Sequence, residues 1–264
     1  MNKKKAKIFA AIGEKGGGGK TTLSQNIAGV LTQSGFKVAI VDTDPQNLAL
    51  KSYAIRLDYI ESIEDKMKEL NDARDSGNYV NERTFSIYQD KVQSLEALKK
   101  LTVHSVSLNI LRKSYIDSIS YDYDYIIIDT PGHFESYRKL EEVIHCSDVV
   151  LAPVANTFDD LSSVPVVCEA FSKAKAVADK KILGFVILHD LNGRRSKQDI
   201  NSDIVEITNK SMPILEERIV KRVSYADAKN IGLSVIEEAK DAVAANQMIR
   251  VVELIIEKMN SEGV

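Results

Sequence analysis

The chemistry of this chain is concentrated in a glycine-rich loop near its start. The loop combines lysines, glycines and hydroxyl groups in the order Lys15, Gly16, Gly17, Gly18, Gly19, Lys20, Thr21 and Thr22. Successive glycines let a backbone turn so that its N–H groups converge on phosphate oxygens, and a helix that follows adds the positive end of its dipole. Lys20 would then reach the β- and γ-phosphates, and Thr21 would ligate Mg²⁺. The loop therefore predicts binding of a nucleoside triphosphate.

One position of this loop departs from the ordinary phosphate-loop pattern. The pattern has a glycine five residues before Gly19, whereas this chain has Glu14 there, followed by a second lysine, Lys15. Lys20 already fills the phosphate cradle, so Lys15 has no evident phosphate to bind within its own subunit. A second subunit could supply one.

Two further apolar stretches end in acidic residues. Val38–Val41 precedes Asp42 and Asp44, and Tyr125–Ile128 precedes Asp129. Because ligands bind at the carboxyl ends of the strands in parallel α/β sheets, we expect these carboxylates to lie beside the glycine-rich loop. A metal ion, two lysines and an acid that orients water would suffice for phosphate hydrolysis. The alternative for the first two acids is a solvated turn opened by the proline that follows them.

Apolar stretches alternate with helical or mixed segments along the whole chain. This alternation predicts an α/β fold with a doubly wound, mostly parallel sheet flanked by helices. The expected strands are Ile8–Ile12, Val38–Val41, Tyr125–Ile128, Val149–Pro153 and Ile182–Leu188. The chain has 264 residues, 44% of them hydrophobic, and can bury a large core, so we expect one domain over residues 1–264.

Residues 48–124 form a variable segment that is rich in charge. Helical stretches are expected near Leu57–Ala73 and Arg83–Leu101. Leu95, Leu98 and Leu101 recur at helical spacing, which favours a helix lying on the sheet over a binding face. No chemistry is evident in this segment.

The overall charge limits how this chain could bind nucleic acid. A net charge of −3 argues against a surface that attracts nucleic acid everywhere. DNA binding would have to be local, because clustered cations can neutralise several phosphates whatever the base sequence. The candidates are Arg194, Arg195, Lys197, Lys221 and Arg222. The alternative is a solvated basic rim.

Cysteines and histidines are too scattered to indicate a metal centre. Cys146 and Cys168 have no CxxC spacing, so we expect neither a disulfide framework nor a zinc site, and a reducing cytoplasm is the expected location. The four histidines lack the spacing of metal ligands. The apolar stretch Ile8–Ile12 is too short for a signal-peptide core, so no signal peptide is expected.

The three motifs together resemble the ParA/MinD ATPases, which carry a deviant Walker A box of the form Lys-Gly-Gly-x-Gly-Lys-Thr-Thr. The resemblance implies ATP and Mg²⁺ as cofactors, and it implies that Lys15 reaches the nucleotide of a facing protomer. Asp42 would hold the water shell of Mg²⁺, Asp44 would orient the attacking water, and Asp129 would be the acid of the Walker B strand.

The resemblance extends beyond the nucleotide motifs. The stretch Glu217–Ala228, with Gly232–Glu237 after it, looks like the corresponding part of small plasmid-partition ParA proteins, and Ala152–Asp160 is similar to the segment after the strand that follows Walker B. One departure is the pair His189 and Asp190, where relatives usually carry Leu-Asn, so the adenine contacts are left open.

The resemblance implies a partition or positioning ATPase of ParA type. Such a protein hydrolyses ATP to ADP and phosphate, forms a homodimer on binding ATP, and binds DNA nonspecifically as that dimer. It implies association with the nucleoid in the ATP state and a ParB-like centromere-binding or cargo adaptor protein as partner. The cargo itself cannot be assigned from these motifs.

Two alternatives leave different marks on the sequence. A MinD-like membrane switch needs an amphipathic basic helix at its C-terminus. An apolar stripe is present there, but its opposite face mixes both charges, which favours a helix packed on the domain; the stripe comprises Ala245, Met248, Ile249, Val252, Ile255, Ile256 and Met259. A metabolic or reductase relative, such as the nitrogenase iron protein or dethiobiotin synthetase, is less expected, because the two cysteines do not match the flanking sequence of the iron protein.

Overall fold

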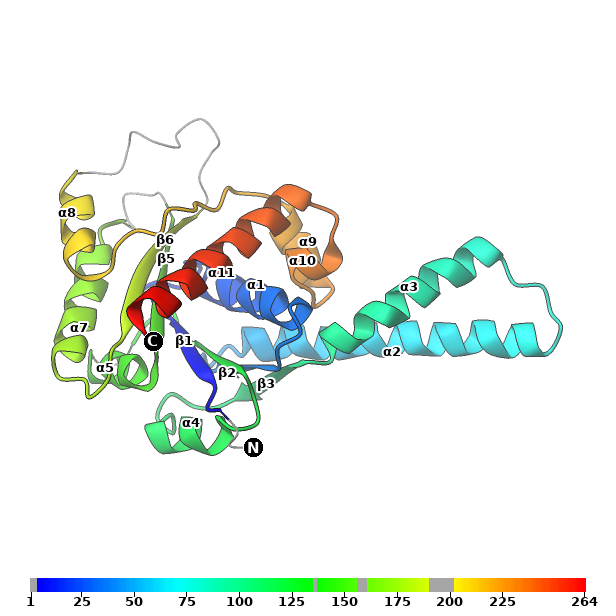
Figure 1. Cartoon of the computed structure of the whole chain (residues 1–264), viewed down its shortest axis with the longest axis horizontal. Coiled ribbons are helices and arrows are strands. Elements are labelled where there is room, and N and C mark those ends of the chain that lie inside the picture. The colour runs from blue at the N-terminus through cyan, green and yellow to red at the C-terminus, as the bar shows by residue number, and fades with distance from the viewer. Residues whose placement is uncertain (1–3, 135–136, 156–160, 190–201) are drawn as a thin grey trace.

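A six-stranded parallel sheet forms the centre of the molecule (Figure 1). The computed structural model describes residues 4–134, 137–155, 161–189 and 202–264. The strands are β1 (Lys7–Ala11), β2 (Val38–Asp42), β3 (Leu101–Ser105), β4 (Tyr125–Asp129), β5 (Val149–Ala155) and β6 (Leu183–His189). All five strands expected from the sequence are present, and β3 is additional.

The strand order is β3-β2-β4-β1-β5-β6. The chain runs from β1 outward to β3, returns to β4 beside β1, and then continues through β5 to β6 on the other side. This reversal is the mark of a doubly wound sheet, in which ligands bind at the carboxyl ends of the strands where the direction changes. The sheet therefore confirms the predicted fold class and places β1 at its centre.

Helices cover both faces of the sheet. One face carries α4 (Lys113–Ile119), α5 (Tyr137–Cys146), α7 (Val164–Ala176) and α8 (Ser202–Ser211). The other carries α1 (Lys20–Gln33), α9 (Ser224–Asn230), α10 (Val235–Glu238) and α11 (Ala242–Glu262). Successive strand residues point to opposite faces, so Ile8 and Ala10 belong to the first core cluster and Phe9 to the second. Strands buried on both faces explain the continuous apolar runs in the sequence.

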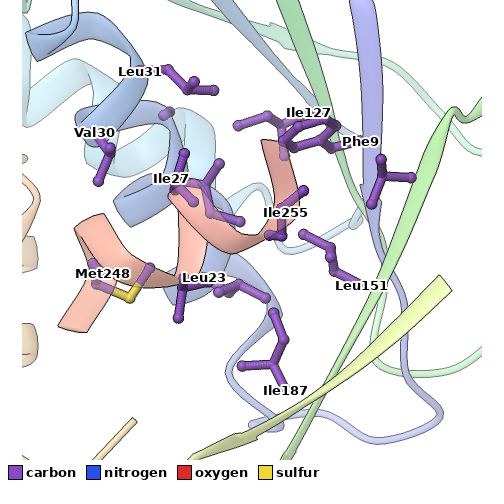
Figure 2. Packing of buried hydrophobic residues seen from close by; sticks show 14 of the residues in the cluster. Phe9, Leu23, Ile27, Val30, Leu31, Ile127, Leu151, Ile187, Met248 and Ile255 are labelled. Carbon is purple, nitrogen blue, oxygen red and sulfur yellow. The ribbon is translucent and has the colours of Figure 1, made fainter. Parts of the chain in front are cut away.

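The C-terminal helix α11 packs into this second core. Figure 2 shows Met248 and Ile255 facing Leu23 and Ile27 of α1, over the strand residue Phe9. The apolar stripe of the C-terminal segment is thus occupied by the protein's own core, as the packed-helix interpretation predicts. Within the described residues, no helix combines the length and the apolar character needed to cross a bilayer.

Helices α2 (Leu48–Asp75) and α3 (Glu82–Leu98) form an arm that extends away from the sheet (Figure 1). Both expected helices exist, but the prediction of a helix through Leu101 was wrong, because this residue begins β3. The spacing of Leu95, Leu98 and Leu101 imitates a helical period. In the structure only the first two pack in the core at the base of the arm, where they meet Ile60, Ile63 and Leu233.

A buried ion pair fastens the arm to the body. Arg56 of α2 is 2% exposed, and its guanidinium binds the carboxylate of Glu237 in α10. The same guanidinium donates to the carbonyls of Leu98, at 3.1 Å, and Gly232, at 3.2 Å. Burial acts to raise the pKa of Glu237, but the charge of Arg56 and hydrogen bonds from Arg56 and Ser234 bring it below its usual value. Arg56 therefore joins α2, α3 and α10 at one point.

Candidate functional site

The glycine-rich loop connects the end of β1 to the first turn of α1, as the sequence predicts. Gly17 and Gly19 have φ values of +79° and +82°, which residues with a side chain rarely adopt. Gly19 is the N-cap of α1, and no side chain caps the first-turn N–H groups. These groups and the positive end of the helix dipole make the loop an anion site.

The two lysines of the loop lie in different environments. Lys20 is 6% exposed, and its Nζ donates to the carbonyl oxygen of Lys15 at 2.7 Å. Burial lowers the pKa of Lys20, and the charges of Asp129 and Asp44 oppose that shift. Lys15 is exposed, although it lines a small pocket together with Lys20. Lys20 is therefore the buried lysine of the loop and Lys15 the exposed one.

Asp42 and Asp129 lie directly opposite one another on the neighbouring strands β2 and β4. Asp129 is fully buried, and this burial, with the nearby charge of Asp42, raises its pKa to about 7, although hydrogen bonds from Thr21 and Ser24 act to lower it. Its Oδ1 accepts from Ser24 Oγ at 3.2 Å, while Oδ2 has no hydrogen-bond partner among the described residues. A buried carboxylate oxygen without a partner, beside the hydroxyl of Thr21, fits Mg²⁺ or one of its water ligands.

Asp42 also has a structural role, at the start of α2, that the sequence did not indicate. Its Oδ1 accepts from the N–H of Asp44 and its Oδ2 from the N–H of Leu50, both at 3.1 Å. Burial raises its pKa. The carboxylate thus holds the first turn of α2 in addition to its predicted role with Mg²⁺. Asp44 is half-buried, and its Oδ1 accepts from the N–H of Gln46 at 2.8 Å.

The loop after β4 touches the glycine-rich loop through backbone atoms. A Cβ atom added to Gly132 would lie 2.4 Å from the nitrogen of Gly16 and 2.9 Å from the carbonyl carbon of Lys15. Such distances leave no room for a side chain. A side chain at position 132 would therefore displace the phosphate loop or the segment after Asp129.

A pocket of about 360 Å³ opens beside the loop. Its lining includes Thr22, Asn26, Tyr225 and the two predicted DNA-contacting residues Lys221 and Arg222. Lys221 is exposed, whereas Arg222 is ion-paired with Asp241 and thereby partly neutralised. The structure therefore brings these two cations to the phosphate loop. The other predicted DNA contacts, Arg194, Arg195 and Lys197, lie outside the described residues.

Sequence reasoning missed one residue of the site. His189, at the end of β6, has its Nε2 3.0 Å from the carbonyl oxygen of Gly18. The sequence marks His189 only as one of four scattered histidines and as a departure from the Leu-Asn pair usual in relatives, and it gives no contact with the phosphate loop. The signal that could have found it is the alternation along its strand, since residues 185, 187 and 189 share the face that α1 covers.

No group of three or more His, Cys, Asp or Glu residues in the described part of the chain is arranged to hold a metal ion. The ligands of Mg²⁺ would be the hydroxyl of Thr21, water molecules and the phosphates themselves. Asp129 and Asp42 would hold the water ligands. Both cysteines are buried and unpaired. Burial raises the pKa of Cys146 to about 11 and also raises that of Cys168, so neither thiol has the character of a cluster ligand presented to a second subunit.

Comparison with known proteins identifies relatives of this arrangement. A family model described as an AAA domain matches residues 6–182, about two thirds of the chain. The sporulation initiation inhibitor protein Soj of Bacillus subtilis is 27% identical over 235 residues, which cover 89% of this chain and 79% of Soj. The virulence plasmid ParA family protein pGP5-D of Chlamydia psittaci is 26% identical, with 97% of this chain and 96% of that protein covered.

Solved structures share the fold. An ATP complex of a McdA variant from Cyanothece superposes with a TM-score of 0.64 at 18% identity, covering 95% of this chain and 96% of that one. The septum site-determining protein MinD of Pyrococcus horikoshii, complexed with Mg-ADP, gives a TM-score of 0.60 at 17% identity with the same coverage. Nucleotide and Mg²⁺ binding thus accompany this fold in solved relatives.

Proposed function

We propose, from the premise that this chain belongs to the AAA-domain family and is a ParA/MinD-type P-loop ATPase, that it is a positioning ATPase of ParA type. In this proposal it forms one domain that hydrolyses ATP to ADP and phosphate with Mg²⁺ and dimerises around the bound nucleotide. The relatives named for a plasmid ParA family and for septum-site determination support a role in placing a cargo. A ParB-like or adaptor protein is the proposed partner.

The observation that carries the proposal is the contrast between the two loop lysines. Lys20 is buried and donates to the loop carbonyl of Lys15, whereas Lys15 itself is exposed. In this proposal the exposed lysine reaches the nucleotide of a facing copy. Asp44, half-buried beside the loop, is the proposed acid that orients the attacking water.

Light scattering with MgATP tests the dimer directly. We expect Lys15→Gln to abolish the ATP-dependent dimer while nucleotide affinity stays within about threefold of wild type, because the cradle is intact. Lys20→Gln should instead abolish nucleotide binding. Asp44→Ala should form the dimer and fail to turn over ATP. A Lys15→Gln protein that dimerises like wild type would refute the proposal, as would wild-type turnover by Asp44→Ala.

DNA binding is the finer part of the proposal. A net charge of −3 makes strong binding by one subunit unexpected, so the dimer must pair two weak basic patches. Pairing raises effective concentration, and avidity can add roughly 10²–10⁴ in affinity without a new kind of contact. Binding should ignore base sequence and weaken steeply with salt, because counterions are released.

A gel shift with nonspecific duplex DNA, with and without ATP, checks this part. Arg195→Glu combined with Lys221→Glu should remove binding and leave DNA-independent ATP hydrolysis unchanged. Lys258→Glu in α11 combined with Lys68→Glu in α2 is the control of equal charge change, since both lysines are exposed. Absence of ATP-dependent binding at low salt would reject the DNA role and leave the ATPase proposal standing.

A further inference from the structure

His189 reaches the phosphate loop from two strands away. It ends β6, which pairs with β5, which in turn pairs with β1. Because a carbonyl oxygen can only accept, the 3.0 Å contact with Gly18 means that Nε2–H donates. The imidazole also lies over the next glycine, since a Cβ on Gly19 would be 3.1 Å from Nε2. His189 itself is 9% exposed.

The register of β6 directs this side chain to the loop. Phe185 and Ile187 point to the face covered by α1, and their cluster includes Leu23 in the first turns of that helix. His189 follows at the same alternation, beyond the end of the apolar cluster. Its ring therefore meets the N-terminus of α1, where the glycine-rich loop ends.

Carbonyl oxygens in a phosphate loop must be held away from the phosphates, because they would repel the anion. Two of them are held by side-chain donors: the carbonyl of Lys15 by Lys20, and that of Gly18 by His189. Lys20 must turn at least one of its three N–H donors to a phosphate when it binds one. His189 can keep its bond throughout, since no step of phosphate binding requires its Nε2–H.

We propose that His189 is a positioning residue for the phosphate loop, holding the Gly18 carbonyl outward so that the loop N–H groups stay directed at the phosphates. This inference rests on the proposed function, because it presumes a bound nucleotide. His189 acts through the loop and not through the base. Its contribution should therefore appear in the affinity for phosphate groups.

Replacing His189 by glutamine or by methionine, two side chains of equal length, distinguishes the effect of the hydrogen bond from that of side-chain size. Glutamine can place an N–H donor near the position of Nε2, whereas methionine has the same length and no donor. With Mg²⁺ and a fluorescent ADP analogue, we expect His189→Met to bind about three- to tenfold more weakly than wild type, the loss of one hydrogen bond. His189→Gln should stay within about twofold of wild type.

His145 provides the matched control. Its Nε2 also donates to a backbone carbonyl at 3.0 Å, that of Ala174, between α5 and α7 and away from the loop. His145→Met should leave nucleotide affinity unchanged. Competition with pyrophosphate and with adenosine completes the test: the weakening in His189→Met should be seen with pyrophosphate and not with adenosine.

The outcomes separate this inference from the proposed function. If wild type binds no nucleotide, the proposed function fails. If wild type binds and His189→Met binds equally well, or if the glutamine and methionine variants weaken equally, the positioning role is overturned. Should His189→Met not fold, ¹⁵N spectra of the wild-type histidines decide: a proton on Nε2 of His189 with and without ADP supports the role, and a proton on Nδ1 overturns it.

Discussion

Charged side chains are buried at the carboxyl edge of the sheet, beside the glycine-rich loop, and exposed on the α2–α3 arm. At the edge, Lys20, Asp42 and Asp129 are buried, and the backbone of Gly132 touches that of Gly16. On the arm, ion pairs such as Arg74–Glu82 join side chains that are 50% and 73% exposed. Exposed pairs of this kind contribute little to stability, because water screens them.

The difference shows where sequence is constrained by chemistry. At this edge, a small displacement of the backbone would move the groups that bind phosphate. Few side chains can therefore be accepted there, and at Gly132 none can. The arm needs only helical periodicity and a solvated surface. It carries ten acidic and five basic residues between positions 57 and 96, which argues against this arm as the DNA contact.

The largest effect is expected at Arg56, because it is a buried charge at the base of an otherwise exposed arm. Arg56→Met leaves the carboxylate of Glu237 buried without its partner, and we expect a loss of about 3–5 kcal/mol in the free energy of unfolding. Chemical denaturation measures it. Arg74→Met, at the exposed pair, should cost no more than about 1 kcal/mol. Adding Glu237→Gln to Arg56→Met removes the charge but keeps an acceptor for the hydrogen bonds from Ser234, and should recover part of the loss; if it deepens the loss, the unpaired charge is not the cause.

A second prediction compares one glycine from each region. Gly132→Ala should lower ATP affinity by about 100-fold, because the added Cβ displaces the phosphate loop. Gly77, between α2 and α3, has open space around it but a φ of +75°. Gly77→Ala should cost about 1 kcal/mol of stability and leave ATP affinity unchanged. Calorimetric titration with ATP measures the affinity of both variants. Equal ATP affinities would show that the added Cβ at position 132 does not displace the phosphate loop.

The smallest expected effect is a difference in hydrogen exchange between the phosphate loop and the arm of the wild-type protein. Binding of a non-hydrolysable ATP analogue with Mg²⁺ should slow amide hydrogen exchange of residues 13–24 by about tenfold or more, because ligand binding suppresses local opening. Exchange of residues 57–75, in the outer part of α2, should not change. Mass spectrometry of the exchanged protein measures both. Slowing in the arm would mean that the arm belongs to the nucleotide-dependent interface.

Sequence patterns predicted the parts of this molecule that obey local rules. The glycine-rich loop, the acids after β2 and β4 and five of the six strands carry their own chemical or periodic signal. Strand β3 was hidden because Leu101 continues a leucine spacing that belongs to α3. The contact of Gly132 with the loop could not be predicted, because it joins segments far apart in the chain. For His189 the strand alternation indicates the face of the sheet but not the contact with Gly18. The structural role of Asp42 depends on where α2 begins, and helix starts are poorly marked when Asn47 caps without a side-chain bond.

The strand order has a consequence for how the protein is made. β1 leaves the ribosome first, yet its neighbours β4 and β5 begin only at Tyr125 and Val149. At ordinary rates of synthesis β1 waits on the order of ten seconds for β4. Both helices of the arm are complete before β4 begins, whereas the glycine-rich loop has no neighbouring strand to anchor it until then. The residues that fasten the base of the arm, Leu233 and Glu237, come later still, so neither the nucleotide site nor the arm junction can be complete until most of the chain has been made.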